Sequence, residues 1–296
     1  MAELAQAPIL SASHSRRKTV VGAVSVAGRL LALLVLLVGA VAFVFPLVWM
    51  FSTSLKAESE VFALPPIWIP DVLRFTNYPD SLTFFPFPLY LRNTLVITVP
   101  SVLTNLISSA LVAYGFARVQ WPGRDAVFNL VLATLLIPSW TTLIPVYVIF
   151  AKIHWVGTFL PLIVPNLFGG AFYIFLLRQF FLRQPLELVD AARIDGCSHL
   201  GVFGRIVLPL SKPALAVVAL FSFMDNWKDF FGPLIYLNDE ALYTLSIGLY
   251  SFQSQHLTQW TVLMAASLMI AAPMIVLFFL TQRTFVEGIT FTGLRG

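Results

Sequence analysis

The chain has 296 residues, of which 58% are hydrophobic and only 11% are charged, and its mean hydropathy is +0.86. Soluble domains carry roughly 25% charged residues, so this composition excludes an ordinary soluble fold and requires lipid as solvent for much of the surface. The net charge of +4 does not indicate nucleic acid, because the basic residues flank apolar segments instead of forming a dense patch.

Six stretches have the roughly 20 mostly apolar residues that a helix needs to cross a bilayer. In chain order they cover about 30–51, 94–119, 126–150, 157–182, 214–237 and 261–280. The first stretch is longer than a signal-peptide core and no small-residue cleavage pattern follows it, so we expect a retained helix. The sequence therefore predicts an all-α, polytopic membrane protein with six transmembrane helices.

The basic residues set the expected orientation. Thirteen of the eighteen Lys and Arg residues fall on the same side as the N-terminus, which the positive-inside rule places in the cytoplasm together with the C-terminus. We expect a flexible cytoplasmic tail over 1–25, a transmembrane domain over 26–283 and a cytoplasmic tail over 284–296. Long outer segments cover 56–91 and about 238–259, and the main inner connection is 183–212.

The inner connection predicts two short helices at an angle. Gly196 allows the sharp turn between them, and Pro209 can start the next membrane helix. In the first helix the expected apolar face combines Leu186, Val189, Ile194 and the paired alanines, and the opposite face combines Glu187, Asp190, Arg193 and Asp195. The alternative, without a partner-binding role, is an amphipathic helix that lies on the membrane surface.

This arrangement resembles the EAA loop of binding-protein-dependent ABC importer permeases, E-A-A-x3-G-x9-I-x-L-P. The residues that match are Ala191, Ala192, Gly196, Ile206, Leu208 and Pro209. Asp190 stands where the family usually has Glu, which keeps the charge but shortens the reach. The resemblance extends over nearly the whole chain beyond Leu30 and is closest to the carbohydrate branch, of the maltose and multiple-sugar type. The stretches that carry it are 45–56, 113–124, 175–181 and 282–296.

The resemblance implies a multi-pass subunit of a bacterial or archaeal inner membrane, working as a heterodimer with a second homologous permease. A separate ATPase dimer would receive the coupling loop, through Glu187, Asp190, Ala191, Ala192, Asp195, Gly196, Ile206, Leu208 and Pro209. An extracytoplasmic solute-binding protein would deliver the cargo. The last outer loop would contact that protein through Gly248, Leu249, Tyr250, Ser251, Phe252 and Gln253.

Polar residues interrupt the fifth apolar stretch. Asp225, Asn226 and Trp227 are candidates for lining a sugar path, since intramembrane charges are costly unless they face a cavity or a partner. The alternative is a turn at the outer interface in which Asp225 pairs with Lys228 or lies beside Asp229, and Trp227 anchors the chain. Weaker candidates for the path are Tyr114, Asn166 and Tyr173.

The chain offers no catalytic or metal site. None of its five lysines follows a glycine, so the phosphate-binding G-x-x-x-x-G-K-[ST] loop is missing. The single cysteine and four scattered histidines have no zinc spacing. We therefore expect no cofactor in this chain, with ATP and Mg²⁺ bound by the partner ATPase subunits.

Three alternatives stay open at this point. An ion-coupled secondary transporter would need buried acids at mid-span, for which only Asp225 and Asp229 qualify. A membrane-embedded enzyme would need convergent acid, base or metal groups, which the sequence does not show. Within the importer class, glycerol 3-phosphate or another polyol derivative could replace the sugar.

Overall fold

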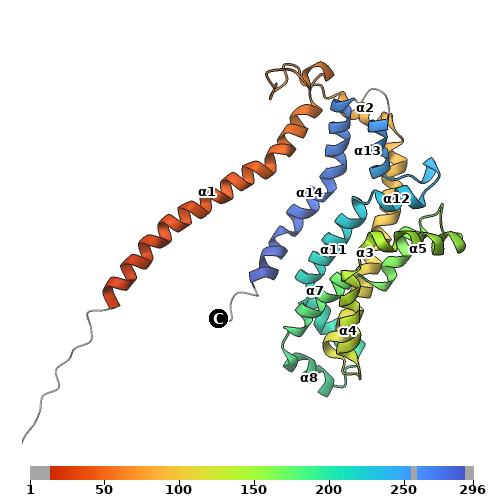
Figure 1. Ribbon diagram of the computed structural model, residues 1–296. Helices are drawn as coiled ribbons and strands as arrows, with labels where there is room; N and C mark the ends of the chain where they lie inside the picture. The colour runs from red at the N-terminus through yellow and green to blue at the C-terminus, as the bar shows by residue number, and fades with distance from the viewer. Residues whose placement is uncertain (1–13, 255–258, 291–296) are drawn as a thin grey trace, which may run out of the picture.

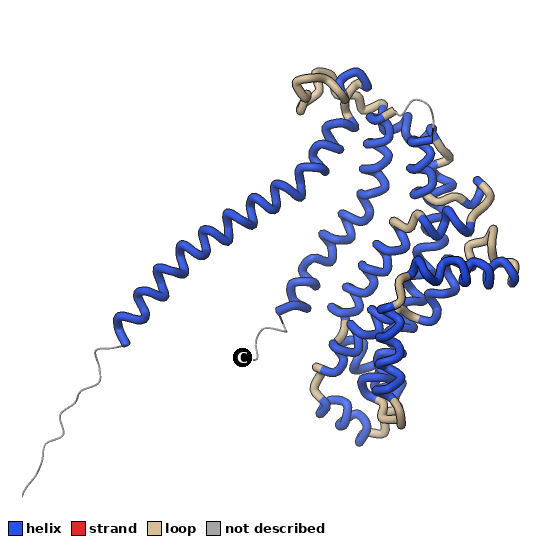
Figure 2. Tube along the Cα trace, viewed as in Figure 1, coloured by secondary structure: helices blue, strands red, loops and turns tan. Residues whose placement is uncertain are grey.

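The structure is a computed structural model that describes residues 14–254 and 259–290, and within these ranges the chain forms helices but no strand (Figures 1 and 2). The three longest helices of the described residues are α1 (His14–Ser54), α3 (Phe87–Arg118) and α14 (Trp260–Thr290). A further candidate span, Leu160–Leu182, joins α6 (Leu160–Ile163), η3 (Val164–Phe168) and α7 (Ala171–Leu182). Two bent helix pairs bring the total to four to six candidate membrane spans.

The first bent pair replaces the predicted straight span over 126–150. Helix α4 (Arg124–Ala133) continues through η2 (Thr134–Leu136), and α5 (Ser139–Lys152) then leaves at an angle of 98°. Pro138 lies at the break, where proline lacks an N–H and disfavours helical geometry in the preceding residue.

The second bent pair lies on the N-terminal side of the predicted span over 214–237. The segment His199–Leu210 comprises α9 (His199–Val202), the π-turn η4 (Phe203–Val207) and α10 (Leu208–Leu210), and it meets α11 at 82°. Helix α11 (Lys212–Trp227) then ends ten residues before the predicted boundary, and α12 (Phe231–Tyr236) is a separate piece. Pro209 therefore lies near the end of the short segment and does not start the membrane helix, which begins at Lys212.

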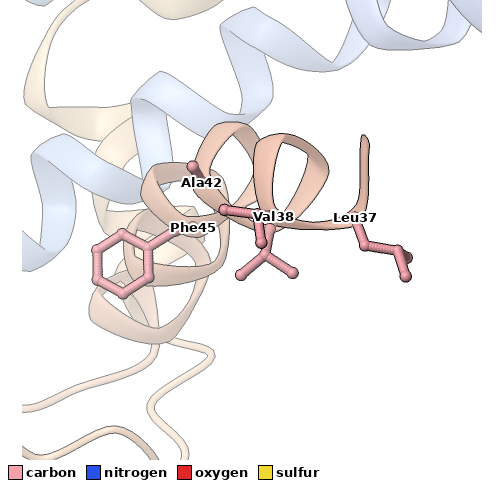
Figure 3. Close-up of a pocket in the computed structure, with 5 residues that line it drawn as sticks. Leu37, Val38, Ala42 and Phe45 are labelled. Atoms are coloured by element: carbon pink, nitrogen blue, oxygen red, sulfur yellow. The ribbon is translucent and has the colours of Figure 1, made fainter. Parts of the chain in front are cut away.

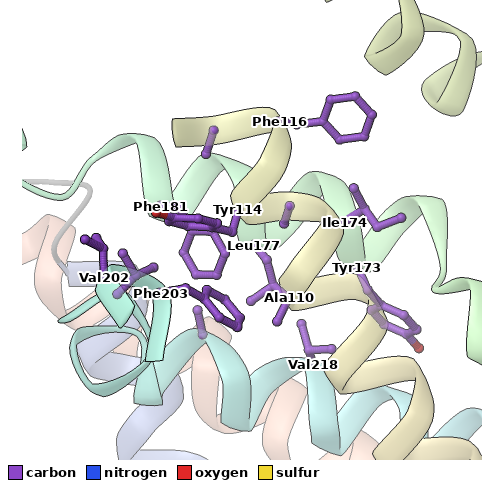
Figure 4. Packing of buried hydrophobic residues seen from close by; sticks show 14 of the residues in the cluster. Ala110, Tyr114, Phe116, Tyr173, Ile174, Leu177, Phe181, Val202, Phe203 and Val218 are labelled. Atoms are coloured by element: carbon purple, nitrogen blue, oxygen red, sulfur yellow. The ribbon is translucent and has the colours of Figure 1, made fainter. Parts of the chain in front are cut away.

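Helix α3 is the centre of the bundle and packs on α7 and α11. Figure 4 shows the contact region, where Ala110 and Tyr114 of α3 lie beside Leu177 of α7 and Val218 of α11. Leu177 and Val218 are completely buried. Small residues such as Ala110 let membrane helices approach closely, which favours association through packing.

Helix α1 diverges from this bundle, as Figures 1 and 2 show. Its main helix neighbour is α14, and none of its most apolar window is buried. A shallow apolar groove of about 560 Å³ follows its side (Figure 3), lined by Leu37, Val38, Val41, Ala42 and Phe45. Such a surface fits contact with acyl chains, because it carries no polar side chain that would lose water.

The segment over 56–91, here named the outer segment after its expected location, joins α1 to α14. It contains η1 (Glu58–Glu60) and α2 (Asn77–Phe84). The Asn77 side chain donates to the carbonyls of Ser54 at 2.8 Å and Lys56 at 3.0 Å, which holds the end of α1. The Glu58 carboxylate accepts from the backbone N–H groups of Trp260 at 2.9 Å and Thr261 at 3.1 Å, so it caps the start of α14.

The remaining elements are short helices at the two ends of the bundle. Helix α8 (Leu186–Ile194) lies at one end, and α13 (Leu245–Ser254), preceded by η5 (Glu240–Leu242), lies near α2 at the other (Figure 1). The predicted outer loop over 238–259 is thus largely helical. Both predicted tails are partly helical. Helix α1 already begins at His14, within the predicted tail over 1–25, and α14 continues to Thr290, within the predicted tail over 284–296.

Candidate functional site

The inner connection over 183–212 is attached to the bundle by apolar side chains. Val189 of α8 is buried, as are Val202, Phe203 and Val207 of the segment that follows. Phe203 contacts Tyr114 of α3 with their rings 5.1 Å apart. The connection is therefore continuous with the hydrophobic core of α3, α7 and α11.

The opposite side of the connection is exposed and combines acids with apolar side chains. Glu187, Asp190 and Asp195 are exposed. Ile194 is 86% exposed and Leu200 71% exposed. Of the residues expected on the apolar face of α8, Val189 is buried and Ala192 half-buried, whereas Leu186, Ala191 and Ile194 are exposed.

The turn between α8 and α9 forms at Gly196, as the sequence predicts. Gly196 has φ of 81°, in the left-handed region that residues with a side chain rarely adopt. The backbone N–H of Cys197 donates to the Ala192 carbonyl at 2.9 Å, which closes the end of α8. Ser198 then caps α9 by accepting from the Gly201 N–H at 3.2 Å. Of the other residues in the motif, Ala191 and Pro209 are exposed, and Ile206 and Leu208 are half-buried.

Three polar residues that the sequence analysis missed join the two ends of the inner connection to the membrane helices. Arg118, the last residue of α3, donates to the carbonyls of Phe181 and, at 2.6 Å, Gln184. The Gln184 amide donates to Ser211 Oγ at 2.7 Å, and that hydroxyl donates to the Val207 carbonyl at 2.6 Å. The ends of α3, α7 and η4 are therefore fixed together, and the signal available in the sequence was a lone arginine ending an apolar run.

A polar hollow of about 390 Å³ lies between α3, the α6–α7 segment and α11–α12. Its lining includes four of the predicted path residues: Asn166, Tyr173, Asp225 and Asn226. Within the described ranges no three His, Cys, Asp or Glu residues are placed to hold a metal ion. The polar groups of the hollow suit hydrogen bonding to a neutral polyhydroxyl ligand, and the tyrosines supply apolar faces.

Asp225 is the best connected acid in the hollow. Its Oδ2 accepts from the Tyr173 hydroxyl at 2.7 Å, and its Oδ1 is 3.6 Å from Lys228 Nζ. The predicted Asp225–Lys228 pair is therefore present, but it lies at the rim of the hollow and coexists with the contact to Tyr173. Asp229, on the same side, accepts from the Gly232 N–H at 3.1 Å and so caps α12.

Asn105 of α3 is a lining residue that the sequence analysis missed. Its Oδ1 accepts from the Gly170 N–H at 3.1 Å and the Ser109 hydroxyl at 2.9 Å, and its amide lies 3.5 Å from Asn166 Oδ1. These bonds satisfy the backbone where the helix is interrupted before α7. An asparagine in the middle of an apolar stretch was the signal that could have found it.

Two predicted path residues lie elsewhere. Tyr114 is 4% exposed and packs in the core beside Phe203, far along α3 from Asn105. Trp227 is also 4% exposed; its indole donates to the Ile270 carbonyl at 2.9 Å, and it borders a small neighbouring cavity of about 20 Å³. Both residues therefore have packing partners within this chain.

The predicted contacts on the last outer segment divide into buried and exposed residues. A side chain at Gly248 would lie 2.7 Å from the Phe85 ring, and Phe252 is 1% exposed and stacks on Phe84 with centroids 3.9 Å apart. These two residues pack inside the chain, whereas Tyr250 is 50% exposed. Leu249 and Ser251 are half-buried, and the side chain of Gln253 lies outside the described residues.

Comparison with known proteins identifies the family. Residues 106–289 match the family model of the binding-protein-dependent transport system inner membrane component. An arabinooligosaccharides transport system permease protein of Halalkalibacterium halodurans is 33% identical over 258 residues, which cover 86% of this chain and 91% of the relative.

Solved structures share the fold. A bacterial ABC transporter for import of the acidic polysaccharide alginate aligns with a TM-score of 0.74 at 22% identity, covering 92% of this chain and 99% of the other. The alginate transporter in complex with its alginate pentasaccharide-bound periplasmic protein aligns with a TM-score of 0.62 at 17% identity, covering 86% and 93%. The chain therefore belongs to the inner membrane components of binding-protein-dependent transport systems, the permease subunits of ABC importers.

Proposed function

We propose that this chain is one of two homologous permease subunits that form a carbohydrate path across the membrane of a bacterium or archaeon. The matched relative carries arabinooligosaccharides and the aligned structures import alginate, so both known cargoes are carbohydrates. The polar hollow, with amides, carboxylates and tyrosine rings, supports a polyhydroxyl cargo.

The observation that carries the proposal is the two-sided inner connection over 183–212. Its exposed side presents Asp190, Ile194 and Leu200 to a partner, and its inner side is packed into the core through Val202 and Val207. A force applied to the exposed side would reach α7 and α11, because buried apolar contacts and the Arg118 hydrogen bonds join them.

The proposed partner at this surface is a separate ATPase dimer that binds ATP and Mg²⁺. Six spans, counted by taking each bent pair as one, would place both chain termini and α8 on the same side of the membrane, and the excess of basic residues there would make that side the cytoplasm. A solute-binding protein would deliver the cargo at the opposite end, where Tyr250 is exposed. The second permease subunit would complete the hollow from its other side.

The test uses the full-length chain purified with its membrane partners and reconstituted in liposomes. Asp190→Lys reverses one exposed charge, and Ile194→Glu replaces one exposed apolar side chain, so neither disturbs the core. We expect both changes to lower ATP-driven uptake about tenfold or more, since an interface centre tolerates unpaired charge poorly. Asp71→Lys, a matched charge change in the outer segment, should leave uptake unchanged.

Copurification of an ATPase that Asp190→Lys releases would support the coupling role of the connection. Transport by the chain alone without ATP, with no effect of either substitution, would contradict it and favour an ion-coupled carrier. Gly196→Pro gives a further check, because proline cannot adopt the positive φ of that turn.

A further inference from the structure

The charges around the polar hollow carry information on the class of cargo, an inference that rests on the proposed function. Among the described residues that line the hollow, the only charged side chains are Asp225 and Asp229. No lysine, arginine or histidine of the described chain lines it. The half of the path built by this chain is therefore negative.

The one nearby cation does not remove this negative charge. Lys228 pairs with Asp225 at 3.6 Å, but its side chain is 60% exposed and lies outside the lining. Exposed pairs of this kind are weak and screened by salt. Asp229 has no ion pair within the described ranges, and its oxygen accepts instead from the Gly232 N–H at 3.1 Å.

The other lining groups are neutral and suit sugar hydroxyls. Asn105, Asn166 and Asn226 contribute amides, and Tyr236 contributes a ring. A carboxylate accepts hydrogen bonds from hydroxyl or ammonium groups, whereas an anionic substituent would meet like charge with no cation to pair. The chemistry of the lining therefore favours donors over anions.

We propose that this half of the path selects uncharged or amine-bearing saccharides and disfavours those that carry carboxylate or sulfonate groups. Asp225 and Asp229 are the residues that determine this selectivity. The likeness in fold to the alginate importer does not extend to cargo charge, because alginate is an acidic polysaccharide and this lining supplies no cation to it.

The potential in the hollow can be measured directly, since the chain has a single native thiol. Cys197→Ser removes that thiol, and Asn166→Cys places a new one in the lining. Two methanethiosulfonate reagents of similar size, one bearing trimethylammonium and one bearing sulfonate, are then applied to the full-length protein with its copurifying subunits in detergent. The ratio of the two modification rates reports the local charge.

We expect the cation-to-anion rate ratio at Asn166→Cys to exceed the ratio at the control Leu64→Cys by about tenfold. Leu64 is 91% exposed in the outer segment, so it reports the intrinsic reactivity of the reagents. Asp225→Asn or Asp229→Asn should each lower the excess several-fold. Asn226→Cys serves as a second reporter in case the first position disturbs folding.

Equal ratios at both reporters and the control, or an excess that survives both neutral substitutions, would overturn the proposal. The readout does not involve uptake or ATP. If the importer test failed, the measured rate ratio would still report the charge of the hollow. If the ratios were equal, only the proposed selectivity would be refuted and not the importer function.

Discussion

Helices α1 and α3 are both long and apolar, yet they have opposite relations to the rest of the chain. The most apolar window of α1 has a mean hydropathy of 2.9 and is 0% buried, whereas that of α3 has 1.9 and is 33% buried. In water the more hydrophobic helix would be the more buried one. Here lipid is the solvent, so burial follows polar and small residues instead.

The polar residues on the buried side of α3 show why this helix packs against the rest of the chain. Its buried polar residues include Asn93, Thr94, Thr98, Ser101, Asn105 and Ser109. Asn93 donates to the carbonyls of Ala241 at 2.8 Å and Tyr243 at 3.0 Å, and Thr94 Oγ1 accepts from the Leu245 N–H at 3.0 Å. Asn93 and Thr94 thus satisfy backbone groups at the ends of short helices, which lipid could not do.

The largest effect should come from overfilling the small-residue side of α3. Ala113 is 0% exposed, and Ala113→Leu adds volume where no space exists. We expect the free energy of unfolding to fall by about 1–3 kcal/mol or more, which a lower thermal midpoint in detergent would show. Ala40→Leu on the exposed side of α1 is the matched control and should leave the midpoint unchanged. Equal effects of the two changes would contradict the comparison.

Asn105→Leu should have the next largest effect. It removes the acceptor of the Ser109 hydroxyl and one of the two acceptors of the Gly170 N–H, which keeps Ser109 Oγ at 3.2 Å, so we expect the free energy of unfolding to fall by about 1–3 kcal/mol. Asn226→Leu provides a control, because that amide donates only to the Ser222 carbonyl of its own helix. If the control lowered the midpoint as much as Asn105→Leu, the bridging role of Asn105 would be wrong.

Glu58→Ala tests how α1 is held at its outer end. The change removes the cap from the start of α14, where Thr261 Oγ1 also donates to the carboxylate at 2.9 Å. We expect about 1 kcal/mol of destabilisation and faster proteolysis of the outer segment. Glu60→Ala removes a nearby acid whose bond, to the Ala57 N–H at 2.9 Å, is local, so its effect should be smaller.

The smallest effect concerns Lys56, which is 0% exposed and whose ammonium lies 3.9 Å from the Trp49 ring centroid. Burial lowers the pKa of this amine, and the charge of Glu60 opposes the shift. The unfolded chain therefore binds the proton more tightly than the folded one, so stability should rise as the pH increases toward the ordinary lysine pKa. Lys56→Met should abolish that rise in stability at alkaline pH. At neutral pH it should change the free energy of unfolding by only about 0.5–1 kcal/mol.

Composition and hydropathy were enough to predict an all-helical membrane chain, and the glycine at 196 was enough to predict the turn after α8. The bends at Pro138 and Ser211 were not predicted, because a hydropathy window averages over a break of two residues. The exposure of Ile194 was not predicted, because amphipathic patterning groups apolar side chains on one face without saying what covers that face. The contact between Glu58 and Thr261 joins positions 203 residues apart, which no local pattern reveals.

Glu58 and its contact on α14 lie far apart in the sequence, and this has a consequence for biosynthesis. Helix α1 leaves the ribosome well before its main helix neighbour, α14, because all the helices from α2 to α13 lie between them in the chain. During most of synthesis α1 must therefore remain in the bilayer without its main helix neighbour, and its partners are limited to the segment that follows it, where Trp68 contacts Phe45 and Trp49. Its hydropathy of 2.9 allows this, because insertion then depends on partitioning of the helix itself. The less apolar α3 can rely on partners that are synthesised soon after it.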